Sequence, residues 1–227
     1  MTEIQDKDDG GVASLHRAAI GEQVRKRLAS NPMVSRIDAP NLEIYGRHAF
    51  LTPQECAVLR AQIDDGAAPS TLFSGSANAE YRTSSSCNLS PWDPVVEGIT
   101  ARIVAMLGVD PASGETLQGQ RYETGQEYRP HCDYFPVAAS YWPAMRKSGG
   151  QRCWTAMIYL NSVAEGGETH FLQSGFMVPP SEGMILAWNN LDRDGAPNPF
   201  SLHAARPVIA GQKYVVTKWF RERPWTP

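Results

Sequence analysis

The sequence predicts an α+β domain in which helices come first and a sandwich or barrel of short strands follows. Apolar residues recur at helical spacing before residue 108, whereas short strand-like runs fill the chain from residue 116 onward. The 17 prolines and 19 glycines are spread along the chain, which is typical of many turns between short strands. A group of helices followed by a group of strands favours the α+β class.

Three helices are expected in the first half of the chain, at about residues 12–28, 52–65 and 91–107. The apolar stripe of the first helix begins at Val12 and Leu15. Thr52 and Glu55 have the spacing of a capping box, in which each side chain bonds the backbone of the other, so the second helix should start there. Gly108 should end the third helix, because glycine readily adopts the left-handed conformation of a helix C-terminus.

Short strands are expected in the second half, with turn residues between them and no further helix. These runs lie at residues 117–122, 128–135, 153–160, 168–171, 184–188 and 214–220. Two more strands are expected earlier, at residues 44–50 and 81–89, the latter within a long loop at 66–91 that is rich in Gly, Ser, Ala and Thr.

Charge and composition exclude several classes of partner. The formal net charge of −3 and the pI near 6.0 provide no basic field for a phosphate backbone, so nucleic acid is not an expected partner. No run approaches the roughly 18 apolar residues of a membrane span, and the acidic first ten residues are unlike a signal peptide. We therefore expect a cytoplasmic protein without a membrane partner, whose four scattered cysteines stay reduced.

A candidate metal site begins at the tripeptide His131-Cys132-Asp133. In a strand, the period of two puts His131 and Asp133 on one face. A second histidine from a distant strand would complete a set of two histidines and one carboxylate, which leaves three positions of an octahedral iron(II) open. His203 fits this role best among the other histidines. The tripeptide alone is a weak signal, because a histidine in a strand is more often a hydrogen-bonded structural residue.

Lys213 strengthens the metal interpretation. It follows His203 by ten residues, across a turn at Ala210-Gly211, so a strand reversal would return its ammonium group to the same cavity. A cation there would bind the far carboxylate of a dicarboxylic co-substrate.

Several fragments then carry a family resemblance in the right order. They are RYETGQEYRPHCDYF at 121–135, RCWTAMIYLN at 152–161, EGGET at 165–169, SLH at 201–203, PV at 207–208, GQK at 211–213 and TKW at 217–219. Together they resemble the catalytic domain of prolyl 4-hydroxylases, within the 2-oxoglutarate oxygenase superfamily. The resemblance extends more faintly to residues 50–56 and 82–84.

The resemblance implies a double-stranded β-helix, or jelly roll, with flanking N-terminal helices. We expect residues 1–40 to form a partly helical extension and 41–227 a single oxygenase domain, with its jelly-roll core at about 116–223. In the family pattern His131, Asp133 and His203 would bind Fe(II). Three further side chains would bind 2-oxoglutarate: Tyr122, Thr155 and Lys213. Residues expected near the substrate are Arg82, Ser84, Tyr134 and Trp219, with the loop at 74–86 beside the entrance.

The implied reaction hydroxylates an unactivated C–H bond with 2-oxoglutarate and O2 as co-substrates and ascorbate as a reductant. The family resemblance suggests prolyl 4-hydroxylation in a peptide or protein. One alternative is a hydroxylase of a free amino acid or another small metabolite. A lower alternative is a non-catalytic metal-binding jelly roll, which would not need Lys213. A zinc hydrolase ranks below these, because it requires a general base near the metal and Glu127 has no matching spacing.

Overall fold

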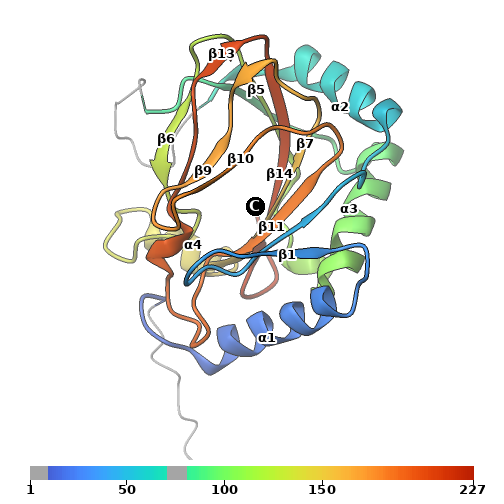
Figure 1. Cartoon of the computed structure of the whole chain (residues 1–227). Coiled ribbons are helices and arrows are strands. Elements are labelled where there is room, and N and C mark those ends of the chain that lie inside the picture. The colour runs from blue at the N-terminus through green and yellow to red at the C-terminus, as the bar shows by residue number, and fades with distance from the viewer. Residues whose placement is uncertain (1–9, 71–80) are drawn as a thin grey trace, which may run out of the picture.

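Two antiparallel sheets face each other and enclose the centre of the protein (Figure 1). The computed structural model describes residues 10–70 and 81–227. Together with helices on one side, the sheets confirm the α+β class and the jelly-roll core that the sequence analysis expected. Among the described residues, no helix combines the length and the apolar character needed to cross a membrane.

The large sheet has eight strands, and the small sheet has four. In spatial order the large sheet consists of β1 (Ser35–Ile37), β2 (Ile44–Arg47), β11 (Ile185–Asn189), β7 (Arg152–Tyr159), β14 (Lys213–Arg221), β5 (Gln118–Tyr122), β4 (Ser85–Asn88) and β3 (Ala68–Pro69). The small sheet consists of β10 (Phe176–Val178), β9 (Thr169–Phe171), β12 (His203–Ala205) and β6 (Tyr128–His131). A separate pair joins β13 (Val208–Ala210) to β8 (Glu165–Gly166).

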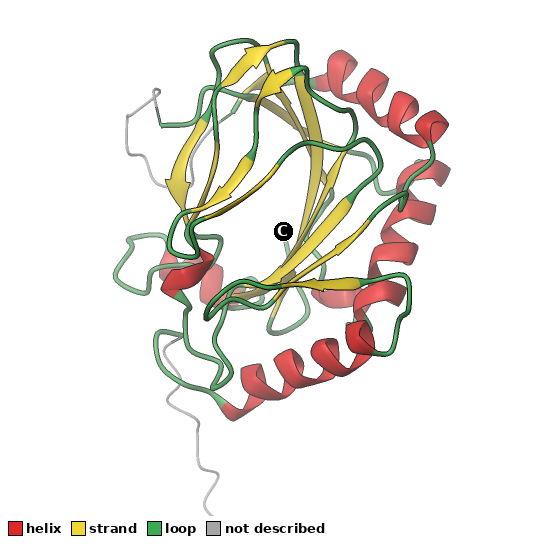
Figure 2. Cartoon of the chain, in the orientation of Figure 1, coloured by secondary structure: helices red, strands yellow, loops and turns green. Residues whose placement is uncertain are grey.

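The three long helices cover only the large sheet. They are α1 (Leu15–Ala29), α2 (Pro53–Gly66) and α3 (Pro94–Leu107), and they lie along the outside of this sheet (Figure 2). A short helix, α4 (Trp142–Lys147), lies near one end of the sheets, in the segment where the sequence analysis expected no helix. That expectation was wrong, because six residues are too few to display a helical period.

Local capping signals set the helix ends. The capping box of α2 is confirmed, since Thr52 and Glu55 exchange backbone and side-chain hydrogen bonds. Gly108 ends α3 in the left-handed conformation, with a φ of 70°, as expected. The start of α3 was placed a few residues too early: the Asp93 carboxylate accepts the backbone N–H groups of Val95 and Val96 and so acts as the N-cap.

The first helix differs from its prediction only at its N-terminal end, since Val24 and Leu28 of the expected apolar stripe are buried. Val12 and Leu15 are 55% and 92% exposed, so the apolar stripe does not begin there. Arg17 is buried instead, because its guanidinium donates to the carbonyl of Gly195 at 2.7 Å and to Glu222 Oε2 at 3.0 Å. A buried cation with such partners is tolerated, and a hydropathy pattern does not reveal them.

Alternation along the central strands separates two apolar clusters. In β7, Trp154, Ala156 and Ile158 face the helices, whereas Met157 and Tyr159 face the small sheet. The same period of two continues through the neighbouring strands β11 and β14. The large sheet therefore has a helix side and an inner side, and the inner side lines a cavity between the two sheets.

Candidate metal centre and cavity

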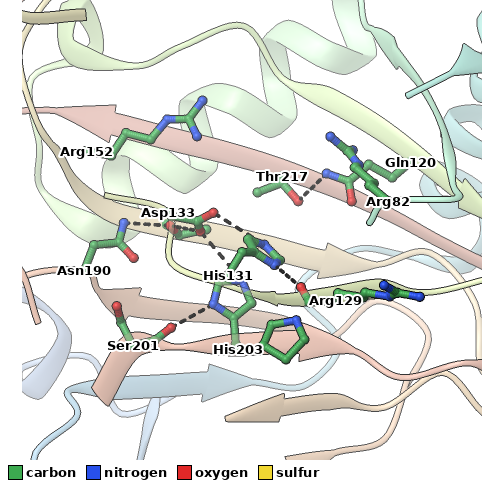
Figure 3. A network of polar contacts seen from close by, with 12 residues as sticks. Arg82, Gln120, Arg129, His131, Asp133, Arg152, Asn190, Ser201, His203 and Thr217 are labelled. Atoms are coloured by element: carbon green, nitrogen blue, oxygen red, sulfur yellow. Dashed lines mark hydrogen bonds and ion pairs between the residues drawn. The ribbon is translucent and has the colours of Figure 1, made fainter. Parts of the chain in front are cut away.

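Three side chains with metal-ligating groups converge on the small sheet. His131 ends β6 and His203 begins β12, and the two residues are paired across these antiparallel strands. Asp133 lies two residues beyond β6, with Oδ1 3.9 Å from His131 Nε2 and Oδ2 3.9 Å from His203 Nε2 (Figure 3). One ligand atom from each residue lies within 4.8 Å of the other two. The structure thus brings together the three residues that the sequence analysis selected.

Asp133 reaches this position by a different route from the one expected. The strand was predicted to run over 128–135, so that a period of two would align His131 with Asp133. β6 ends at His131, and Asp133 lies in a bend. The strand prediction was therefore too long. The convergence comes from the turn of the chain after β6 and from a contact with β7, where Thr155 Oγ1 donates to Asp133 Oδ2 at 2.7 Å.

The hydrogen bonds of both histidines leave the same ring nitrogen available. His131 Nδ1 donates to the carbonyl of Arg129 at 2.9 Å, and His203 Nδ1 donates to the carbonyl of Ser201 at 2.8 Å. Because a carbonyl can only accept, each Nδ1 carries the proton and each Nε2 presents a lone pair. Both Nε2 atoms are the ones nearest Asp133. This tautomer and these backbone partners are typical of histidines that bind metal.

Electrostatics also favour the ligating forms. Burial, together with the neighbouring His203, lowers the pKa of His131 to about 3, so this imidazole is neutral at physiological pH. Burial alone would raise the pKa of Asp133, but charges around it, the Arg152 guanidinium among them, and the hydrogen bond from the Thr155 hydroxyl hold it below its ordinary value. A neutral imidazole and a charged carboxylate are the states that bind a divalent ion. The residues present therefore fit an iron(II) ion.

A small cavity between the sheets extends from these ligands. Its wall is mostly apolar or aromatic, with a few polar groups, and one cation lies beside the three candidate ligands in its lining. The lining residues are Gln120, Tyr122, Tyr128, His131, Asp133, Met157, Thr169, Trp188, His203, Ala205, Lys213, Val215, Thr217 and Trp219. An apolar cavity with a few convergent polar groups is the usual form of a small-molecule site.

The cation of the cavity is Lys213, at the first position of β14. Its side chain is only 1% exposed, and its Nζ lies 5.3 Å from the ring centroid of Tyr122 and 5.6 Å from that of Tyr159. Within residues 10–70 and 81–227, no acceptor forms a hydrogen bond or ion pair with it. Burial lowers the pKa of Lys213 to about 7, against a weaker opposing effect of Glu168. A buried ammonium between two aromatic faces is costly without an anion.

The other two residues assigned to the co-substrate have partners within the protein. Tyr122 lines the cavity, and its hydroxyl donates to Gln120 Oε1 at 3.0 Å. Thr155 is fully buried and lies outside the cavity lining, with its hydroxyl on Asp133. Direct bonds from these hydroxyls to 2-oxoglutarate stay predictions.

The four expected substrate residues fall into three settings. Trp219 lines the cavity. Arg82 and Ser84 are buried beside it: Arg82 Nε donates to Ser84 Oγ at 3.1 Å, and its guanidinium lies over the ring of Tyr128 at 4.9 Å. Tyr134 packs against the apolar cluster on the helix side. Residues 71–80, which include most of the expected entrance loop, lie outside the described residues.

Sequence reasoning missed several residues of the site. Gln120 Nε2 donates to Thr217 Oγ1 at 3.3 Å across the cavity wall, and the Trp188 ring packs edge-on against His203 with centroids 5.0 Å apart. Asn190 lies behind Thr155. Gln120 and Thr217 could have been found from the period of two, since they share a face with Tyr122 and Lys213 respectively. Asn190 had no such signal, because it follows the end of a strand.

Comparison with known proteins first defines the class. Residues 117–221 match the model of the 2OG-Fe(II) oxygenase superfamily, a segment that contains all three candidate ligands and Lys213. The fold agrees with this class: the viral collagen prolyl hydroxylase from Paramecium Bursaria Chlorella virus-1 superimposes with a TM-score of 0.62 at 25% identity. That alignment covers 82% of this chain and 95% of the viral one.

The curated relatives narrow the class to a family. Prolyl 4-hydroxylase 1 of Arabidopsis thaliana is 32% identical over 196 residues, an alignment that covers 78% of this chain and 68% of the relative. Prolyl 4-hydroxylase subunit alpha-3 of Bos taurus is 38% identical over 180 residues, covering 77% of this chain. The chain belongs to the prolyl 4-hydroxylase family. It spans one third of the length of the bovine subunit.

Proposed function

We propose that this protein is an Fe(II)- and 2-oxoglutarate-dependent dioxygenase that hydroxylates prolyl residues of a peptide or protein at carbon 4. One observation carries the proposal. Two histidines and one carboxylate, in the protonation states that bind a metal, share a cavity with a buried lysine that forms no hydrogen bond or ion pair among the described residues. A structural metal site would not need that lysine. Membership of the prolyl 4-hydroxylase family supports the reaction class.

Each group then has a role. His131, Asp133 and His203 would hold iron(II) and leave three positions open. Bound there, iron(II) supplies the oxidative chemistry: O2 and 2-oxoglutarate are consumed, one oxygen atom enters the C–H bond as hydroxyl, and the other enters succinate as CO2 leaves. Lys213 would pair with the distal carboxylate of 2-oxoglutarate. Trp188 and Met157 would exclude water around the ligands, which strengthens each charge interaction in the cavity.

The relatives indicate the class of substrate. The relatives are named as prolyl 4-hydroxylases, and the viral structure is named as a collagen prolyl hydroxylase. Arg82, Ser84, Tyr134 and Trp219 remain our candidates for contacts with a peptide. The alternative, a hydroxylase of a free amino acid or small metabolite, would use the same iron site.

A cytoplasmic location and ascorbate as the reductant stay predictions, as does the division into an extension at 1–40 and a domain at 41–227.

An anaerobic titration of the apoprotein with Fe(II) and 2-oxoglutarate tests the site. We expect the weak visible absorption band of iron chelated by 2-oxoglutarate, and its loss in His203→Ala, since removing one of three ligands leaves the ion poorly held. Addition of O2 with a proline-containing peptide should then release succinate and raise the peptide mass by one oxygen atom.

Three outcomes separate the possibilities. A band with hydroxylated peptide supports the proposal. A band with turnover of free proline, but not of the peptide, would move the function to a small-metabolite hydroxylase. Absence of the band in the unmodified protein would contradict the oxygenase proposal and leave a metal-binding jelly roll.

A further inference from the structure

A buried chain of two hydrogen bonds ends on the carboxylate of the metal site. Asn190 Nδ2 donates to Thr155 Oγ1 at 2.9 Å, and Thr155 Oγ1 donates to Asp133 Oδ2 at 2.7 Å. Figure 3 labels the two ends of this chain, Asn190 and Asp133. Asn190 and Thr155 are both 0% exposed, and Asp133 is 6% exposed. The chain therefore lies in a dry part of the protein, where hydrogen bonds are strong and geometry is tightly held.

The backbone fixes the first member of this chain. The Asn190 N–H donates to the carbonyl of Cys153 at 2.8 Å, and its own carbonyl accepts from the Asn198 N–H at 3.0 Å. Thr155 lies in the middle of β7, between β11 and β14. Both side chains are thus attached to the rigid large sheet, whereas Asp133 lies in a bend after the end of a strand of the small sheet.

The chemistry of the three groups allows only one donor-to-acceptor direction for the two hydrogen bonds. An ionised Asp133 can only accept, so the single hydroxyl proton of Thr155 must point to it. The Thr155 oxygen is then left as an acceptor, and Asn190 must present its NH2 group. Asn190 Oδ1 is buried and has no hydrogen-bond partner among the described residues. A buried amide oxygen without a partner is costly. That an asparagine is nevertheless found here is explained if its NH2 group is needed as the donor to Thr155.

We propose that Thr155 and Asn190 are positioning residues that fix the rotation of the Asp133 carboxylate and thereby set the affinity of the metal site. By occupying Oδ2, Thr155 ties a carboxylate on a non-strand segment to the large sheet, while Oδ1 stays on the side of His131 Nε2. Asn190 acts through Thr155 by orienting its hydroxyl. This inference rests on the proposed metal site and adds residues that do not contact the ion.

The competing role for Thr155 is a direct hydrogen bond to 2-oxoglutarate. The cavity lining includes Asp133 but not Thr155, which is fully buried behind it. With its one proton on Asp133, the hydroxyl has none left to donate to a second anion. The two roles predict different losses. Loss of a co-substrate donor weakens the binding of 2-oxoglutarate, whereas loss of a positioning residue weakens the binding of the metal even when no 2-oxoglutarate is present.

Metal binding without co-substrate is therefore the test. We would titrate the full-length apoprotein with Mn(II), which suits the same ligands, and follow the EPR signal of the free ion. Thr155→Val keeps the shape and the β-branch but removes the hydroxyl, and we expect metal affinity to fall by about 10- to 100-fold. Thr155→Ser should recover most of the affinity. Asn190→Ala should weaken binding less than Thr155→Val, and it should add little in the Thr155→Val background.

Controls separate this inference from the proposed function and from misfolding. Ile158→Val, on the same strand but facing the helices, should leave Mn(II) affinity unchanged. Circular dichroism of each variant checks that the fold persists. If the unmodified protein bound no Mn(II), the proposed function and this inference would both fail. If Thr155→Val remained folded and bound Mn(II) as tightly as the unmodified protein, only the positioning role would be overturned, as it would if Thr155→Ser failed to restore binding.

Discussion

Two buried lysines on the same strand, β14, show how differently the two sides of the large sheet are used. Lys218 faces away from the cavity, is 5% exposed, and donates to the backbone carbonyl of Glu115 at 2.5 Å. Lys213 faces the cavity, is 1% exposed, and has no acceptor within the described part of the chain. Burial lowers the pKa of both ammonium groups, to about 8 for Lys218 and about 7 for Lys213.

Burial alone therefore does not distinguish a structural lysine from one that binds a ligand; the supply of acceptors does. On the helix side, a backbone carbonyl satisfies Lys218 in the free protein. On the inner side, the two aromatic faces around Lys213 stabilise a cation only in part, and the remaining partner has to come from outside. Replacement of Lys213 should therefore weaken ligand binding without lowering stability, whereas replacement of Lys218 should lower stability without weakening ligand binding.

The largest expected effect comes from Lys213→Met, which keeps the length of the side chain and removes its charge. Loss of one partner of a buried charge pair costs about 2–5 kcal/mol, so 2-oxoglutarate affinity should fall by roughly 30- to several thousand-fold. In the absence of ligand, the melting temperature should rise, because an unpaired buried ammonium is replaced by an apolar group. Calorimetric titration with the Mn(II)-loaded protein and thermal unfolding of the apoprotein measure the two effects.

Lys218→Met is the matched control on the opposite side. It removes the hydrogen bond to the Glu115 carbonyl, so the free energy of unfolding should fall while 2-oxoglutarate affinity stays unchanged. Equal losses of affinity in both variants would show that the two sides are not functionally distinct, and the role of Lys213 would have to be withdrawn.

A smaller effect is expected from pH. Without ligand, the pKa of Lys213 is about 7, so above pH 7 most of this side chain is neutral. The dianionic co-substrate favours the protonated form, and binding above pH 7 must therefore take up a proton. Affinity should be highest below pH 7 and should fall by up to about tenfold per pH unit as the pH rises through the range above 7. Titration calorimetry in two buffers of different ionisation enthalpy counts the protons taken up.

Lys213→Arg sharpens this prediction, because arginine stays charged throughout this pH range. Whatever affinity remains in that variant should be independent of pH between 7 and 9. If the unmodified protein also bound 2-oxoglutarate equally well at pH 7 and 8.5 without proton uptake, Lys213 would not be the titrating partner of the ligand.

The sequence predicted those parts of the molecule that short-range rules determine. The capping box at Thr52, the helix end at Gly108 and most strands of the β half follow from local patterns, and they are confirmed. The three candidate metal ligands could be selected because histidine and aspartate are typical metal ligands. The fragments around them also resemble those of the family and occur in the same order. Lys213 could be selected because a turn at Gly211 precedes it.

What the sequence did not predict depends on contacts between distant segments. Arg17 is buried because Glu222 and Gly195 approach it from the far end of the chain, so its polarity misled the helical pattern. Asn190 and Thr155 acquire their partner only when β7 packs behind Asp133. Asp133 itself is oriented by that contact and not by the strand period that first suggested it. Such side-chain networks leave no periodic signal in one sequence.

The smallest expected effect tests whether the two sides of the large sheet act independently. Ile158 lies on β7 within the helix-side cluster and is 0% exposed. Ile158→Val removes one methylene group from this cluster, which should lower the free energy of unfolding by about 0.5–1.5 kcal/mol. Denaturant unfolding of the apoprotein measures this change.

The affinities for Mn(II) and 2-oxoglutarate should not change, because Thr155, Met157 and Tyr159 keep their positions on the opposite face. A loss of ligand affinity equal to the loss of stability would instead show that packing against the helices holds the cavity wall in place, so that the sheet transmits strain between its faces.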